Sequence, residues 1–123
     1  MGNTLKRAVL IVDDEEVIRN FLYEVFSEDY DVSLAIDGDE AIEKLKVSKF
    51  DVIITDLMMP NVSGEEVVKF ACENEPNTKV IVISGFSSLH TVSQSINNGA
   101  CAFLSKPFSI KEVQQTVINA LDQ

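Results

Sequence analysis

Three aspartates directly follow two apolar stretches of this 123-residue chain. Asp13 and Asp14 come after Ala8–Val12, and Asp56 comes after Val52–Thr55. Carboxylates held close together repel one another, and they remain ionised together most easily when a cation joins them. Hard oxygen ligands with room left for water and a phosphate oxygen suit Mg²⁺, with Mn²⁺ as a substitute. The aspartates are therefore a candidate metal site, although a capping role for the first two and a strand end for the third remain open.

A hydroxyl and an ammonium group follow two further apolar stretches. Ser84 comes directly after Val80–Ile83, and Lys106 lies two residues beyond Ala102–Leu104. Alone, such a serine is usually a turn residue and such a lysine is usually solvated. Together with the aspartates they supply a carboxylate nucleophile, metal ligands and donors for phosphoryl oxygens. This combination predicts a phosphoryl-transfer site.

Alternating strands and helices would bring these residues together. The five strand-length runs are almost continuously apolar, as in strands of a parallel sheet that are buried on both faces. Segments of helical periodicity follow each of them. The pattern predicts an α/β fold, a flavodoxin-like doubly wound (βα)5 arrangement with five parallel strands in the order 2-1-3-4-5. In that order the first and third strands are neighbours, so their aspartates converge at the carboxyl edge. The predicted strands are Ala8–Val12, Val32–Ala35, Val52–Thr55, Val80–Ile83 and Ala102–Leu104.

Local signals mark the helix ends. Capping boxes are expected at residues 63–66 and 109–112, with an aspartate analogue at 37–40. Gly99 is expected to end the fourth helix in a left-handed conformation. That helix, around residues 89–96, is rich in Ser, Thr and Asn and has a poor intrinsic propensity, so we expect it to be the element most easily repositioned.

Charge and composition exclude several classes of function. Twenty acidic against ten basic residues give a net charge of −10, which argues against direct binding of nucleic acid or an anionic membrane by this domain. No stretch approaches the roughly 20 apolar residues of a membrane span. Cys72 and Cys101 lack the spacing of metal ligands, and we expect them to be small buried residues in a reducing cytoplasm. Most other acids, Glu15 among them, are expected to be solvated.

Four motifs in order resemble the receiver domain of bacterial two-component response regulators. The resemblance runs from Val9 to Leu121 and implies a single receiver domain over residues 1–123, cytoplasmic and not itself an enzyme. The motifs are Val12-Asp13-Asp14-Glu15, Thr55-Asp56-Leu57-Met58-Met59-Pro60 with Gly64, Ile83-Ser84-Gly85 and Lys106-Pro107-Phe108.

The resemblance implies a role for each site residue. Asp56 would accept a phosphoryl group from a phosphohistidine of a histidine kinase or histidine phosphotransfer protein. Asp14 would bind Mg²⁺ directly and Asp13 directly or through water, with the backbone carbonyl of Met58 as a further ligand. Ser84 and Lys106 would each contact a phosphoryl oxygen. The resemblance also implies a cis bond between Lys106 and Pro107.

The resemblance further implies a switch and a docking patch. Phe103 stands where receivers often carry a switch tyrosine; it lacks the hydroxyl, and ordinary strand packing is the alternative. Phosphorylation would alter the face formed by the fourth helix, fifth strand and fifth helix, for a downstream protein, a fused output domain or a dimer. Ile18, Pro107 and Phe108 would dock the kinase or phosphotransfer protein, with core packing as the alternative for Ile18. Apolar Met58 and Phe86 suggest slow loss of the phosphoryl group.

Three other interpretations fit the residues less well. An aspartate-nucleophile phosphatase needs a second aspartate two residues after the nucleophile, where Met58 stands. A flavin- or nucleotide-binding module would carry a glycine-rich loop after the first strand, and none is present. A degenerate receiver that works by contact alone would not need the complete set of acids with Ser84 and Lys106.

Overall fold

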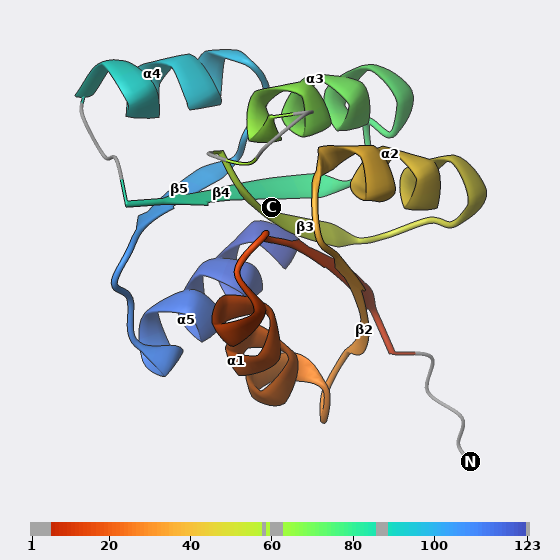
Figure 1. Ribbon diagram of the computed structural model, residues 1–123, viewed down its shortest axis with the longest axis vertical. Helices are drawn as coiled ribbons and strands as arrows, with labels where there is room; N and C mark the ends of the chain where they lie inside the picture. Colours follow the sequence, from red (N-terminus) through yellow and green to blue (C-terminus); the bar gives the residue numbers. More distant parts are fainter. Residues whose placement is uncertain (1–5, 58, 60–62, 86–88, 123) are drawn as a thin grey trace.

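A single parallel sheet forms the centre of the molecule (Figure 1). The computed structural model describes residues 6–57, 59, 63–85 and 89–122. Its strand order, β2-β1-β3-β4-β5, confirms the predicted flavodoxin-like arrangement. Each neighbouring pair is parallel, so all five carboxyl ends lie at one edge. The strands are β1 (Ala8–Val12), β2 (Asp31–Ala35), β3 (Val52–Asp56), β4 (Lys79–Ser84) and β5 (Ala102–Ser105).

Helices cover both faces of the sheet. In Figure 1, α2, α3 and α4 lie above the sheet and α1 and α5 lie below it. The helices are α1 (Glu16–Phe26), α2 (Gly38–Val47), α3 (Gly64–Asn74), α4 (Leu89–Asn97) and α5 (Ile110–Leu121).

The sheet separates two hydrophobic clusters. Along β1, Leu10 and Val12 join the cluster beneath α2 and α3, whereas Val9 and Ile11 join the cluster against α1 and α5. Both faces of the central strands are buried, which explains why their sequences are continuously apolar rather than alternating.

The helix ends follow the sequence signals with one exception. Ser109 and Glu112 form the predicted capping box of α5, and the Asp37 carboxylate accepts from the Glu40 N–H at the start of α2. Gly99 has a φ of 115°, as expected. The predicted box at α3 is wrong: Ser63 precedes the helix but makes no side-chain cap hydrogen bond. The Gly64 N–H at this end donates instead to the Leu57 carbonyl.

The cysteine prediction was also wrong in part. Cys72 is exposed because it follows buried Ala71 and falls on the outer side of α3, whereas Cys101 is half-buried. Both thiols are free. In the described part of the chain, no helix has the length and apolar character to cross a membrane.

Candidate functional site

Residues of three strand ends meet at the carboxyl edge of the sheet. Val12 is paired with Thr55, so the next residues, Asp13 after the end of β1 and Asp56 at the end of β3, lie side by side. Asp13 is completely buried and Asp56 is 4% exposed. Ser84, at the end of β4, is buried as well. The topology therefore brings together residues that are up to 71 positions apart in the sequence.

Lys106 places its ammonium group among three carboxylates. Its Nζ atom lies 3.1 Å from Asp13 Oδ2, 3.1 Å from Glu15 Oε1 and 3.2 Å from Asp56 Oδ2. The side chain is 18% exposed. The Lys106 N–H donates to the Ser84 carbonyl at 2.9 Å, and the bond to Pro107 is cis, as predicted. The lysine thus enters the site from the end of β5.

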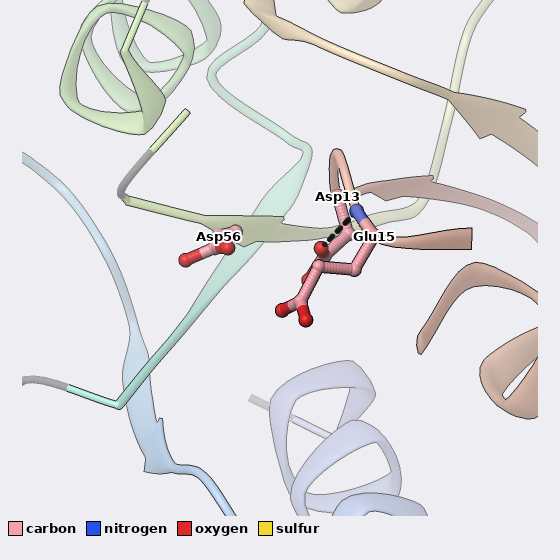
Figure 2. A group of neighbouring side chains, drawn as sticks. All are labelled: Asp13, Glu15 and Asp56. Carbon is pink, nitrogen blue, oxygen red and sulfur yellow. Dashed lines mark hydrogen bonds between the residues drawn. The ribbon is translucent and has the colours of Figure 1, made fainter. Parts of the chain in front are cut away.

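Glu15 belongs to this site, which corrects the expectation that it is only a solvated acid. Its N–H donates to Asp13 Oδ1 at 2.9 Å, the bond drawn in Figure 2. Carboxylate oxygens of Asp13, Glu15 and Asp56 lie within 4.8 Å of one another. Its position three residues beyond the end of β1, in the turn before α1, was the available signal, because that turn lies at the same edge as the strand end.

Two predicted metal ligands are not placed in this cluster. Asp14 is exposed and is not among the three clustered carboxylates. Its role as a direct ligand stays a prediction. Met58 lies outside the described residues, as do Pro60 and Phe86.

Burial and charge shift two pKa values in the cluster. Burial raises the pKa of Asp13; the hydrogen bond from the Glu15 N–H lowers it, the charge of Asp56 raises it further, and the net change is upward. For Lys106, burial alone would lower the pKa, but the hydrogen bond to Glu15 and the close pairing with the Asp13 carboxylate outweigh it and raise the pKa above its usual value. Lys106 is therefore charged at neutral pH, whereas ionised Asp13 is disfavoured by its surroundings.

The donor set fits a hard divalent cation. Asp13 Oδ2 is buried and, among the residues described, receives no directed hydrogen bond; Lys106 faces it only as an ion pair. An incompletely satisfied buried carboxylate oxygen beside two further carboxylates suits an ion that prefers oxygen, such as Mg²⁺. The residues present are thus compatible with the metal that the sequence predicted.

Two contacts fix the backbone around the cluster. The Arg19 guanidinium donates to the Asp13 carbonyl at 2.8 Å and ties α1 to the end of β1. Gly64, the first residue of α3, packs on the main chain of β3: a Cβ atom there would lie 1.9 Å from the Asp56 carbonyl oxygen. Only glycine permits this close approach.

Of the predicted switch and docking residues, Phe103 lies in β5, Ile18 lies in α1, and Pro107 and Phe108 follow β5. Phe103 is half-buried and packs against the cluster beneath α2 and α3. Ile18 and Phe108 are half-buried and pack against the other cluster, and the Phe108 ring centroid lies 6.1 Å from that of Phe21. Pro107 is exposed. Core packing thus accounts for part of the Ile18 and Phe108 surfaces, and the remainder is open to solvent.

Comparisons with known proteins agree with this geometry. The family described as "Response regulator receiver domain" matches residues 9–118. The chain is 34% identical to the chemotaxis protein CheY of Thermotoga maritima, over 90% of this chain and 94% of that protein. It is 34% identical to the response regulator ArlR of Staphylococcus saprophyticus, over 85% of this chain but 48% of ArlR.

Longer relatives and solved structures extend the comparison. The chain is 33% identical to hybrid signal transduction histidine kinase D of Dictyostelium discoideum, over 94% of this chain and 8% of the kinase. The chain thus spans half or less of ArlR and of this kinase. The receiver domain of the Francisella response regulator 1452 is 32% identical and superposes with a TM-score of 0.88, over 95% of this chain and 98% of that domain.

Proposed function

This chain belongs to the response regulator receiver domain family of two-component signalling, and on that premise we propose that Asp56 accepts a phosphoryl group from a phosphohistidine. The observation that carries this proposal is the position of Asp56. Its carboxylate lies at the end of a central strand, beside the buried carboxylate of Asp13 and 3.2 Å from the ammonium of Lys106. A nucleophile, metal ligands and a cation are thus in one place.

The transfer is a substitution at phosphorus. An Asp56 carboxylate oxygen bonds to phosphorus, the bond from phosphorus to the donor imidazole nitrogen breaks, and the imidazole leaves with its electron pair. Negative charge accumulates on the equatorial oxygens, where the Lys106 ammonium and the Ser84 hydroxyl donate hydrogen bonds. When bound, Mg²⁺ offsets further charge on the same oxygens. Asp13 and Asp56 would hold the ion, together with Asp14 and the Met58 carbonyl; Mn²⁺ would be its substitute.

The phosphorylated site would alter a surface some distance away. The aspartyl phosphate carries about 1.5–2 units of negative charge and new acceptors, where the free Asp56 carboxylate carries one unit. Ser84 would move toward the new oxygens, and Phe103 would follow it inward. The surface formed by α4, β5 and α5 then changes for a downstream protein, a fused output domain or a second phosphorylated copy.

The donor would be a histidine kinase or a histidine phosphotransfer protein in the cytoplasm. The exposed parts of Ile18, Pro107 and Phe108 would form its docking patch at the mouth of the site. Receiver domains normally act as phosphoacceptors rather than enzymes. For this chain we expect only intrinsic self-phosphorylation from small donors and loss of the phosphoryl group, both by the same residues.

Intact mass spectrometry tests the proposal. The domain is incubated with Mg²⁺ and acetyl phosphate, and its mass is compared with that of Asp56→Asn. We expect a phosphate-sized gain for the wild type and none for the variant. Absence of the gain in both proteins, or an equal gain in both, would overturn the proposal.

A further inference from the structure

The ammonium group of Lys106 lies where a divalent cation would bind. It lies 3.1 Å from Asp13 Oδ2 and 3.2 Å from Asp56 Oδ2, and both carboxylates belong to the group whose oxygens lie within 4.8 Å of one another. Two cations repel each other at such short range. A metal ion that takes these two carboxylates must therefore displace the lysine from both of them.

Glu15 differs from the other two carboxylates in accessibility. Its side chain is 61% exposed, whereas the side chains of Asp13 and Asp56 are almost completely buried. Its main chain is anchored, because the Glu15 N–H donates to Asp13 Oδ1. The anchored backbone and the longer, solvent-facing side chain allow Glu15 to stay paired with a lysine that moves outward.

We propose that Glu15 is a positioning residue: it holds the Lys106 ammonium at the rim of the site when Mg²⁺ occupies the carboxylates of Asp13 and Asp56. The lysine is then kept within reach of the transferred phosphoryl group instead of extending into solvent. The proposal deepens the function proposed above, because it assigns a partner to Lys106 in the metal-bound site.

Nuclear magnetic resonance of the Lys106 side chain tests this directly. A paired lysine ammonium exchanges its protons with water more slowly than a solvated one, so its Nζ signal reports pairing. The signal is recorded for the wild type and Glu15→Gln, each with EDTA and with saturating Mg²⁺. Glu16→Gln, the exposed neighbouring acid in the first turn of α1, is the matched control.

The expected loss of pairing depends on the metal. Without Mg²⁺, Lys106 should stay protected in every protein, because Asp13 and Asp56 still hold it. With Mg²⁺, protection should persist in the wild type and in Glu16→Gln and disappear in Glu15→Gln. Protection retained in Glu15→Gln with Mg²⁺, or lost from the wild type, would overturn the proposal.

The rate of phosphorylation provides a second measurement. A decrease or an increase in this rate distinguishes loss of lysine positioning from loss of the repulsion between Glu15 and the anionic donor. At saturating Mg²⁺, loss of positioning should slow phosphorylation of Glu15→Gln by acetyl phosphate about twofold to fivefold, the range of a partly exposed ion pair. In a protein that already carries Lys106→Gln, Glu15→Gln should not slow phosphorylation further. A faster reaction in Glu15→Gln would mean that Glu15 only repels the anionic donor, and would contradict the proposal.

The two proposals can fail separately. A phosphate-sized gain on Asp56 together with a Lys106 signal that does not depend on Glu15 would reject only the role of Glu15. The expected Lys106 signals without phosphorylation of Asp56 would reject the phosphoacceptor function and leave the pairing intact.

Discussion

Ser84 and Lys106 are joined through the main chain: the Lys106 N–H donates to the Ser84 carbonyl at 2.9 Å. Ser84 ends β4 and is paired in register with Ser105, and Lys106 directly follows Ser105. The side chains of Ser84 and Lys106 are the two donors expected at the phosphoryl oxygens. A movement of one strand end is therefore transmitted to the other.

Ser84→Ala should separate phosphorylation from the structural response. The substitution removes the hydroxyl but keeps the backbone bond to Lys106, so Asp56 should still be phosphorylated. The switched state should be destabilised relative to the resting state by roughly 1.5–3 kcal/mol, the contribution of a hydrogen bond to a charged group. Backbone amide shifts in α4, β5 and α5 after addition of acetyl phosphate measure the response. Ser105→Ala, an exposed strand-end serine, should respond like the wild type, and an equally large response in Ser84→Ala would exclude the switch role of Ser84.

Lys106→Gln should destabilise the metal-free domain. It leaves the buried carboxylates of Asp13 and Asp56 without their cation, and breaking a buried ion pair from one side costs about 3 kcal/mol. Urea denaturation in EDTA measures the loss, and added Mg²⁺ should recover part of it. Lys49→Gln is the matched control, because Lys49 pairs with Glu75 at 3.3 Å but is 89% exposed. This variant should lose less than about 1 kcal/mol of stability. Equal losses in the two variants would show that the cluster does not need a cation.

Asp13→Asn should stabilise the metal-free domain at neutral pH. Folding raises the pKa of Asp13 above its usual value of 3.8. The folded protein therefore binds more protons than the unfolded chain at any pH between the unfolded and the folded pKa. The contribution of this group to stability therefore falls as pH rises through that window. We therefore expect the variant to be more stable than the wild type near pH 7, with a smaller gain near pH 4.

Urea denaturation in EDTA at both pH values checks this prediction. Asp14→Asn, at the exposed neighbouring aspartate, should change stability little at either pH. A lower stability of Asp13→Asn at neutral pH would mean that the ion pair with Lys106 outweighs the burial of the Asp13 charge.

Gly64→Ala should displace the phosphoacceptor. The new Cβ would lie 1.9 Å from the Asp56 carbonyl oxygen and 2.7 Å from the Leu57 Cα, so the main chain has to shift. We expect a loss of about 1–3 kcal/mol in stability, as for other overpacked sites, and slower phosphorylation of Asp56. At Gly85 a Cβ would have no neighbour within 4 Å among the residues that the structure describes, so Gly85→Ala should remain within about 0.5 kcal/mol of the wild type. Similar stabilities for the two variants would contradict the close packing of α3 on β3.

The sequence was sufficient to predict the sheet and most of the cluster. Apolar runs buried on both faces revealed the strands, and parallel strand ends necessarily share an edge, which brought Asp13, Asp56, Ser84 and Lys106 together. Contacts that depend on exact packing were harder to foresee. Ser63 and Ser109 have the same spacing to a glutamate, yet only Ser109 caps its helix, because the start of α3 is held by Leu57.

Glu15 escaped prediction for a related reason. Its side chain looks like any acid near the start of a helix, and its importance comes from a lysine 91 positions later in the chain. Which of many acids a lysine reaches depends on the path of the main chain after β5. No local pattern around Glu15 encodes that path.

Lys106 acts as a built-in counter-ion when no metal is bound. Because this ammonium is covalently part of the chain, its local concentration does not vary with the surrounding medium, and the repulsion between the acids is offset before any metal arrives. Removal of divalent ions should therefore stop the chemistry without unfolding the domain. When magnesium returns, it enters a site that is already assembled.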